Sequence, residues 1–256
     1  MTERDLLDER VLALLEKGSL RPLGLLPRAS NYTFLAEVSD DSGDGSNPSS
    51  DKGPAAGPLA LAVYKPQDGE SPLWDFPDGT LCRREVAAYR LSRALGWPEV
   101  PPTVLREGPL GVGSVQLFVD ADPNEHYFTL REVCLDAFMP VAAFDVVANN
   151  ADRKGGHCLR GTDGTVWVVD HGVCFSSEPK LRTVIWEFAG EPVPAPLIQD
   201  VRRLAEELRS GPLRADMLDL LTAREVDATA SRADALAATG RFPEPGTRRA
   251  YPWPPV

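Results

Sequence analysis

One stretch decides the fold, FDVVANNADRKGGHCL at residues 144–159. It closes a long run over 130–149 whose composition indicates a mainly helical segment, and a polar loop that includes Asp152 follows. A short apolar strand comes next over 166–170, directly before a His-Gly pair, and Asp170 is its last residue. The sequence therefore predicts two aspartates, one behind a helix and one at the end of a strand.

Two further charged residues lie upstream on predicted elements. Lys65 stands near the end of the compact apolar run 59–66, which a proline closes, as expected of a buried strand. Glu85 lies in the next predicted helix, over 81–95, and Gly96 is its stop signal. A lysine held by a glutamate can bind the phosphates of a nucleotide, one aspartate can orient an attacking hydroxyl, and another can hold magnesium. The set favours phosphoryl transfer, whose catalysis depends mostly on positioning and charge neutralisation.

The other predicted elements divide the chain into a strand-rich first half and a helical second half. They are a helix at 5–17, strands at 23–26, 32–38, 100–106 and 113–119, and helices within 197–240. Residues 39–58, dense in Ser, Asp, Gly and Pro, predict a flexible insert, and the proline-rich tail 242–256 is expected to lie extended on the surface. We therefore predict an α+β protein of two lobes with a cleft between them. The N-terminal lobe spans 1–119 and the helical C-terminal lobe spans 120–256.

The composition limits the classes of partner. The 256 residues include 38 acidic and 27 basic side chains, a formal net charge of −11. Such a chain repels phosphate backbones, which argues against nucleic-acid binding through a general basic face. No apolar run approaches the ~20 residues that span a bilayer, and the first residues carry no signal core, so we expect a cytoplasmic protein. The cysteines and histidines lack the close pairs of zinc sites, so structural zinc is not expected.

The order and spacing of these motifs resemble the protein-kinase superfamily. The run Ala62-Val63-Tyr64-Lys65 stands where kinases have Val-Ala-Ile-Lys, Glu85 lies early in the following helix, and Asp170-His171-Gly172 takes the place of Asp-Phe-Gly. Residues 144–152 are similar to the Phe-Asp/Asn-x-x-x-x-Asn-x-Asp stretch of the phosphatidylinositol 3- and 4-kinase superfamily and of HipA-type kinases. From about residue 20 to 250 the chain resembles the actinobacterial phosphatidylinositol 3- and 4-kinase-like proteins.

This resemblance implies a two-lobed protein-kinase-like fold with a nucleotide cleft, and ATP with Mg²⁺ or Mn²⁺ as cofactors. It implies that Lys65 binds the α- and β-phosphates, that Glu85 holds this lysine, and that Asp152 is the catalytic aspartate. Asp170 would be the principal metal ligand, with His157 at the position of a second ligand. The remaining ATP-binding residues implied are Ser30 and Asn31 over the phosphates, and Val63, Gln116, Leu117, Phe118, Val119, Leu159 and Val169 around the adenine.

Two positions depart from the kinase pattern. The turn Arg28–Tyr32 that would cover the phosphates lacks the Gly-x-Gly-x-x-Gly pattern, as do the corresponding loops of phosphatidylinositol kinases. His157 stands where most kinases have the asparagine that binds the second metal ion. An imidazole suits manganese better than magnesium, so we hypothesise weak or manganese-preferring turnover.

The predicted function is that of an ATP-dependent phosphotransferase, an atypical protein kinase that phosphorylates an unknown protein or itself and does not insert stably into membranes. A lipid acceptor is less favoured, because an acidic chain without a polybasic patch has little attraction for anionic membranes. A small-molecule acceptor stays open. The alternative from another class is a nucleotide-binding pseudokinase that serves as a scaffold or sensor.

Three residues beside the motifs have competing interpretations. Arg153 and Lys154 either neutralise a transferring phosphate or form a solvated corner, and the sequence favours neither. His171 is interpreted as a core residue held by a hydrogen bond rather than as a catalytic group.

Overall fold

The structure is a computed structural model that describes residues 3–27, 31–40, 59–246 and 249–256. Contacts divide the chain into two compact units. The first unit comprises Met1–Cys82 and Pro102–Phe118, and the second comprises Arg83–Pro101 and Val119–Val256. Each unit is described here by itself.

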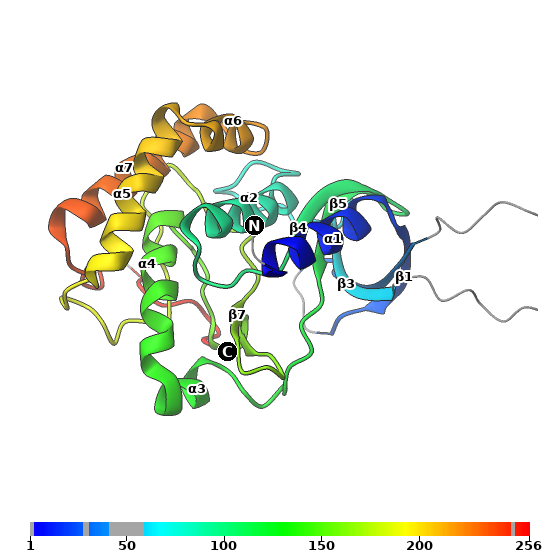
Figure 1. Ribbon diagram of the computed structural model, residues 1–256, viewed down its shortest axis with the longest axis horizontal. Helices are drawn as coiled ribbons and strands as arrows, with labels where there is room; N and C mark the ends of the chain where they lie inside the picture. Colours follow the sequence, from blue (N-terminus) through cyan, green and yellow to red (C-terminus); the bar gives the residue numbers. More distant parts are fainter. Residues whose placement is uncertain (1–2, 28–30, 41–58, 247–248) are drawn as a thin grey trace, which may run out of the picture. The chain divides into compact units, whose positions relative to one another are not determined.

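The first unit is an antiparallel sheet accompanied by one helix (Figure 1). Its sheet has five strands in the order β1-β2-β3-β5-β4, so neighbouring strands are joined by hydrogen bonds between antiparallel partners. The elements are α1 (Glu3–Lys17), β1 (Ser19–Leu25), β2 (Phe34–Ser39), β3 (Leu59–Pro66), a 3₁₀ turn (Gln67–Gly69), β4 (Thr103–Gly108) and β5 (Gly111–Leu117).

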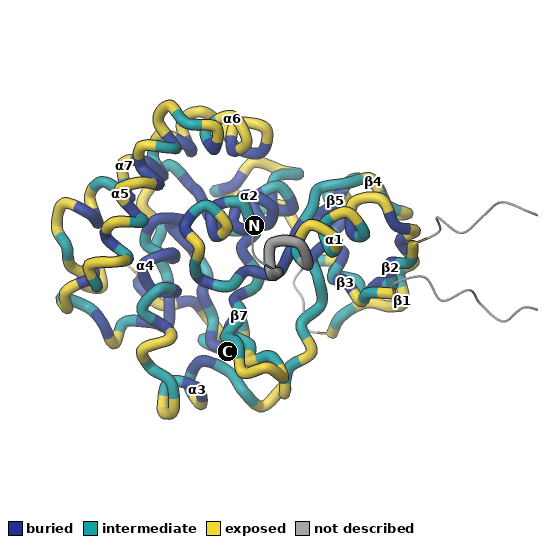
Figure 2. Tube along the Cα trace, in the orientation of Figure 1, coloured by how far each residue is buried: buried dark blue, intermediate teal, exposed yellow. Residues whose placement is uncertain are grey.

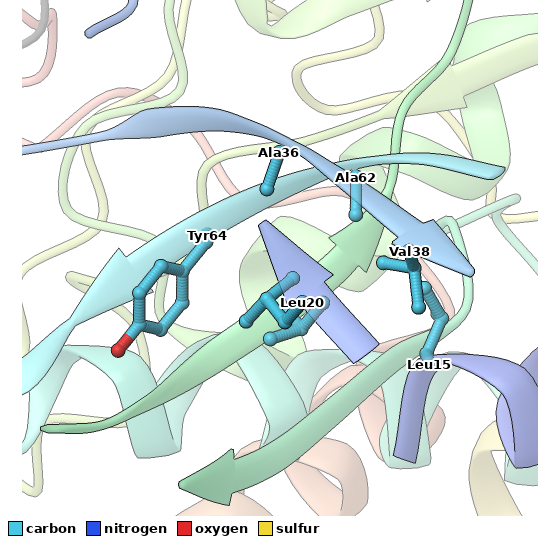
Figure 3. Close-up of a cluster of buried hydrophobic side chains, with 7 residues drawn as sticks. Leu15, Leu20, Ala36, Val38, Ala62 and Tyr64 are labelled. Carbon is cyan, nitrogen blue, oxygen red and sulfur yellow. The ribbon is translucent and has the colours of Figure 1, made fainter. Parts of the chain in front are cut away.

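The core of the first unit is apolar. Its buried side chains come from α1 and four of the strands, namely Leu15, Leu20, Ala36, Val38, Ala62, Tyr64 and Val115. Figure 3 shows Leu15 beside Val38, with the small residues Ala36 and Ala62 on neighbouring strands. These alternating positions point to one face of the sheet, because side chains on a strand alternate between its two faces. The burial of this face holds the sheet and α1 together.

The C-terminal end of α1 is fixed against the sheet. The helix ends at Lys17, the predicted end, and Gly18 follows it; a Cβ at Gly18 would lie 2.7 Å from a methyl group of Val38. Arg106 of β4 donates from Nη1 to the carbonyl oxygens of Leu15, at 3.0 Å, and of Gly18, at 2.7 Å. An arginine satisfies the last carbonyls of a helix and also complements the helix dipole, so this contact fixes α1 on the strands.

The second unit is mainly helical (Figure 1). Most of α2 (Leu81–Leu95) belongs to it. The other elements are α3 (Tyr127–Cys134), a 3₁₀ turn (Leu135–Phe138), α4 (Met139–Ala148), a 3₁₀ turn (Gly155–His157), the hairpin of β6 (Cys158–Arg160) and β7 (Val166–Val168), α5 (Ala195–Ser210), α6 (Pro212–Leu218) and α7 (Ala223–Thr239).

Seven of the ten residues of helix α4 are buried, and Figure 2 shows buried segments along it. It packs against α7, which in turn packs against α5. The N-terminus of α7 has a capping box in which Thr222 and Glu225 bond to each other's backbone N–H groups, and Gly240 ends the helix with φ 61°. These helices form the frame that carries the loops after α4 and β7.

The α+β class, with strands in the first half and helices in the second, is confirmed. The helix expected over 130–149 is interrupted by the 3₁₀ turn Leu135–Phe138, and the short strand β6 was not predicted. Within the described residues, no helix has the length and apolarity to cross a bilayer. Of the predicted insert 39–58, Ser39 closes β2, and residues 41–58 lie outside the described part of the chain.

Eight of the thirteen described residues of the tail 242–256 are exposed, and the others fix the tail to the rest of the second unit. Ala250 and Pro252 are buried, and the carbonyl oxygen of Ala250 accepts from the Thr183 N–H at 3.1 Å. The carbonyl oxygen of Pro255 accepts from the Gly155 N–H at 2.7 Å. Backbone hydrogen bonds of this kind cannot be deduced from composition, so the sequence did not predict these attachments.

Candidate functional site

Four predicted site residues of the first unit, Val63, Lys65, Gln116 and Leu117, lie on the neighbouring strands β3 and β5. Lys65 of β3 is opposite Ser114 of β5, and Val63 is opposite Gln116. Gln116 is buried, and its Nε2 donates to Thr103 Oγ1 at 2.8 Å, so its side-chain amide is engaged within the sheet. Leu117 ends β5, and the N–H of Phe118 donates to the Leu61 carbonyl at 2.9 Å.

The turn predicted to cover the phosphates is described in part. Ser30 lies outside the described residues. Asn31 accepts through Oδ1 from the backbone N–H of Ser71 at 2.8 Å, which joins this turn to the loop after β3. The N–H of Tyr32 also donates to the Gly69 carbonyl at 3.0 Å, so the described end of this turn is joined to the loop after β3 by two hydrogen bonds.

The loop of the second unit that contains Asp152 is fixed by one residue near the end of α4 and one just after it. Asn150 donates from Nδ2 to Asp145 Oδ1 at 3.0 Å, and its Oδ1 accepts from the backbone N–H of Asp152 at 3.0 Å. Both Asn150 and Asp145 are buried. Their amide and carboxylate groups fix the backbone of Asp152 directly after the helix.

Arg153 is the centre of a buried polar network. Its side chain is 0% exposed and donates from Nε and Nη2 to the Asp145 carboxylate at 2.9–3.1 Å. Its Nη1 donates to the carbonyl oxygen of Val169 at 2.9 Å, and its Nη2 lies 2.8 Å from His171 Nε2. Because an arginine only donates, His171 Nε2 accepts in this contact. Arg153 therefore joins the loop that contains Asp152 to both neighbours of Asp170.

Both sequence interpretations of Arg153 are wrong. The residue neither faces a transferring phosphate nor forms a solvated corner, because its guanidinium is enclosed and paired. The signal that could have found it is Asp145, a carboxylate in an otherwise apolar helix. A buried carboxylate needs a cationic or hydrogen-bonding partner, and Arg153 is the nearest arginine along the chain.

Glu85 is fixed next to the Asp-His-Gly motif. Its Oε2 accepts from the backbone N–H of His171 at 2.9 Å, and the residue is 2% exposed. His171 is fully buried, and its ring meets the Phe144 ring edge-on at 5.5 Å. The interpretation of His171 as a hydrogen-bonded core residue is confirmed.

Asp170 and His157 form a close pair. The Nε2 of His157 lies 3.1 Å from Oδ2 of Asp170, and Asp170 has a φ of 62°, which is uncommon for a residue other than glycine. Backbone strain of this kind is often found at functional sites. Among the described residues, no group of three or more His, Cys, Asp and Glu side chains is arranged to hold a metal ion.

The hydrogen bonds of His157 define the position of its proton. Its Nδ1 accepts from the backbone N–H of Lys154 at 3.3 Å, so in the neutral ring the proton is on Nε2. That nitrogen then donates to Asp170. A protonated Nε2 has no lone pair for a metal, and moving the proton to Nδ1 would break the contact with Lys154.

Asp152 is half-buried between charges of both signs. Burial raises the pKa of its carboxyl, and the charge of Asp170 raises it further, whereas Lys154 and Arg182 act in the opposite direction. Lys154 Nζ lies 3.2 Å from Asp152 Oδ2. The net rise in the pKa makes Asp152 more basic than an exposed aspartate, which suits a group that accepts a proton.

The three remaining predicted residues lie in the second unit. Leu159 of β6 is opposite Trp167 of β7, and the N–H of Val169 donates to the His157 carbonyl at 3.0 Å. Leu159, Val169 and Val119 are each half-buried. Leu159 and Val169 thus belong to the same hairpin region that carries Asp170.

Comparison with known proteins places the chain among relatives. No family model matches it. Over 99% of its length it is 40% identical to Protein Rv2133c of Mycobacterium tuberculosis, of which 97% is covered. A second match, to Phosphatidylinositol 4-kinase gamma 4 of Oryza sativa subsp. japonica, has 31% identity over 52% of this chain and spans 30% of that protein. The solved structure of the Helicobacter pylori proinflammatory kinase CtkA covers 87% of this chain and is itself covered to 97%, with 12% identity and a TM-score of 0.43. The extent and identity of the first match show that the chain belongs to the family of Protein Rv2133c.

Proposed function

We propose that the protein is an ATP-dependent phosphotransferase that acts on a hydroxyl group of a protein, its own chain included. The observation that carries this proposal is the buried network around Arg153, which holds Asp152 and both neighbours of Asp170 in one unit. The partial match to a protein named as a phosphatidylinositol 4-kinase supports the same chemistry. Protein Rv2133c, which matches this chain over 99% of its length, has a name that states no activity.

In this proposal Asp152 acts on the acceptor hydroxyl. The acceptor oxygen forms a bond to the γ-phosphorus of ATP while the bond from that phosphorus to the β–γ bridging oxygen breaks, and ADP leaves with the electron pair. The hydroxyl proton goes to Asp152, whose pKa is raised by burial. Lys65 binds the α- and β-phosphates with Glu85 as its partner, and Ser30 and Asn31 cover the phosphates. The residues proposed to bind the adenine are Val63, Gln116, Leu117, Phe118, Val119, Leu159 and Val169.

Asp170 is proposed as the residue that holds a divalent ion. One carboxylate together with nucleotide phosphates and water is a usual environment for Mg²⁺, so the residues present fit such an ion. When bound, the ion neutralises negative charge on the phosphates. The position of His157 in the motif suggests a metal ligand, but its hydrogen bonds favour another role. We propose that it donates to Asp170 and keeps this carboxylate in place.

The experiment that tests the function is incubation with γ-labelled ATP. Label transferred to the protein or to a generic acceptor protein should appear in the wild type and be lost in Asp152→Asn and in Asp170→Asn. Asp163→Asn is the matched control, because Asp163 lies in the exposed turn between β6 and β7. Equal labelling in all four proteins would contradict the proposal. Thermal stabilisation by ATP without transfer in any of them would support the pseudokinase alternative.

The part assigned to His157 has its own test. If His157 is a hydrogen-bond donor, His157→Gln should retain transfer because its amide also donates, whereas His157→Leu should lower it. Mn²⁺ binding followed by electron paramagnetic resonance should survive both changes, and the wild type should show no preference for manganese over magnesium. Loss of Mn²⁺ binding in both variants would instead make His157 a ligand and restore the manganese hypothesis.

A further inference from the structure

Arg182 lies beside Asp152 because a short segment pairs with the catalytic loop. The N–H of Arg153 donates to the Arg182 carbonyl at 3.0 Å, and the N–H of Val184 donates to the Arg153 carbonyl at 3.1 Å. Arg153 and Thr183 form the parallel bridge of this pairing, so Arg182 stands next to Asp152 in register. The N–H of Arg182 also donates to the Asn150 carbonyl at 2.9 Å. Both the carbonyl and the N–H of this arginine are therefore fixed by backbone hydrogen bonds to the loop after α4.

The side chains of Arg182 and Lys154 bring positive charge to the candidate catalytic aspartate. Both side chains are half-buried, and each lowers the pKa of Asp152. Within the described part of the chain, no carboxylate lies at ion-pair distance from Arg182. Lys154 is paired with Asp152, and Asp170 lies near the same carboxylate, so Arg182 is the cation of this group that stands beside carboxylates without an ion pair of its own among the described residues. In a chain of net charge −11, such a cation is a place where an anionic group can bind.

The C-terminal tail adds exposed aromatic rings next to these cations. Besides its bond to Thr183, the Ala250 carbonyl accepts from Trp186 Nε1 at 3.2 Å. The Trp186 and Tyr251 rings meet at 6.5 Å. Tyr251 is 53% exposed and Trp253 76% exposed, and both line a hollow of about 490 Å³ formed by residues 249–253. The tail also reaches the catalytic loop at Gly155. The aromatic rings and the cations thus belong to adjoining segments.

The geometry points to an acceptor site for an extended acidic segment of a protein, formed by Lys154, Arg182 and the tail aromatics Tyr251 and Trp253. This inference rests on the proposed function and names the acceptor for that same site. An extended peptide can place its carboxylates at the two cations and its backbone over the aromatic rings, whereas a compact ligand would reach only part of this surface. Charge complementarity favours acidic residues beside the phosphorylated hydroxyl.

The test measures peptide binding without nucleotide or metal. Three fluorescein-labelled peptides carry one serine flanked on both sides by glutamates, glutamines or lysines, and fluorescence anisotropy follows their titration with the full chain. The glutamate peptide should bind most tightly and the lysine peptide least. Arg182→Gln should weaken the glutamate peptide about fivefold, the size expected for one partly exposed ion pair, and should leave the glutamine peptide unchanged. Trp253→Ala should weaken the binding of both the glutamate and the glutamine peptide.

Arg209→Gln is the matched control for Arg182→Gln. Arg209 lies on α5, its side chain is 51% exposed, and it pairs with Asp234. Binding of the glutamate peptide should be the same in this variant as in the wild type. Thermal unfolding of each variant shows that it is folded before its binding is compared, and Trp253→Ala tests the site independently if Arg182→Gln fails to fold.

Several results would overturn the inference. Equal binding of the three peptides would do so, as would equal effects of Arg182→Gln and Arg209→Gln. Binding to phosphatidylcholine vesicles only when they contain phosphatidylserine, lost in Arg182→Gln and without peptide binding, would assign the surface to a membrane. If the glutamate peptide binds but no peptide accepts phosphate, the site stands and the proposed function fails. If phosphate is transferred equally to the glutamate and glutamine peptides, the proposed function stands and this site fails.

Discussion

The core of the first unit and the polar core of the second are built from different contacts. Leu15, Val38 and Ala62 bury apolar surface between α1 and the sheet. In the second unit, Asp145, Arg153 and their neighbours are equally buried but are joined by directional hydrogen bonds. Apolar packing accepts changes of shape, whereas a buried ion pair does not accept the loss of one partner. The second core therefore positions loops accurately, and these are the loops that carry Asp152 and Asp170.

The largest expected effect comes from removing one partner of the buried pair. Arg153→Met should lower the free energy of unfolding by about 3–5 kcal/mol, because Asp145 is left charged and unpaired in the interior. Urea unfolding monitored by circular dichroism measures this change. The double variant Asp145→Leu/Arg153→Met should be more stable than Arg153→Met, since it leaves no isolated charge. A double variant as unstable as the single one would show that the ion pair is not the reason for the loss.

A truncation in the apolar core should cost somewhat less. Leu15→Ala should lower the free energy of unfolding by about 3 kcal/mol, because Leu15 is 0% exposed and a cavity would remain. Leu15→Met, which keeps the volume, should cost less than about 1.5 kcal/mol in the same urea experiment. If Leu15→Met were as destabilising as Leu15→Ala, the tolerance attributed to this core would be wrong.

A polar contact at the edge of the second unit should matter less than the central network. Thr222→Ala removes the capping box of α7 and should cost about 1 kcal/mol of unfolding free energy. Thr222→Ser keeps the hydroxyl that accepts from the Glu225 N–H and should be close to the wild type. Thermal unfolding compares the three proteins, and equal losses in both variants would contradict a capping role.

The smallest expected effect is a change in pH dependence from the Arg84–Glu225 pair. Burial acts to raise the pKa of Glu225, but the charge and hydrogen bonds of Arg84 and the backbone contact at Thr222 lower it overall. A carboxyl whose folded pKa is lowered stabilises the fold above its ordinary pKa and loses this contribution as the pH falls through the folded value.

Unfolding measured from neutral pH downwards checks this sign. The stability difference between the wild type and Glu225→Gln should shrink as the pH falls below the ordinary glutamate range. Glu206→Gln, an exposed change on α5, serves as the control. A difference that stays constant over the whole pH range would contradict the lowered pKa.

The sequence predicted the parts of the molecule that depend on local pattern. The apolar run ending near Lys65 is a strand, and the region of Glu85 is a helix that ends before Gly96, because periodicity and stop signals are local properties. The α+β division followed from the same signals. The breaks around Leu135 and the short strand β6 were missed, since both are set by packing rather than by propensity.

The sequence could not predict how the polar residues pair. Asp145 and Arg153 lie eight positions apart, and only the turn after α4 brings the guanidinium back onto the helix. The proton position on His157 depends on a backbone N–H that no motif records. The contact between Gly155 and the tail joins segments about a hundred residues apart, so neither composition nor spacing reveals it.

The most direct test of the account is a crystal structure of the protein with a non-hydrolysable ATP analogue and Mg²⁺. The account predicts that an ion is bound by the Asp170 carboxylate, that the γ-phosphate analogue lies next to Asp152, and that His157 still donates to Asp170. An analogue bound away from Asp152, or an ion bound without Asp170, would contradict it.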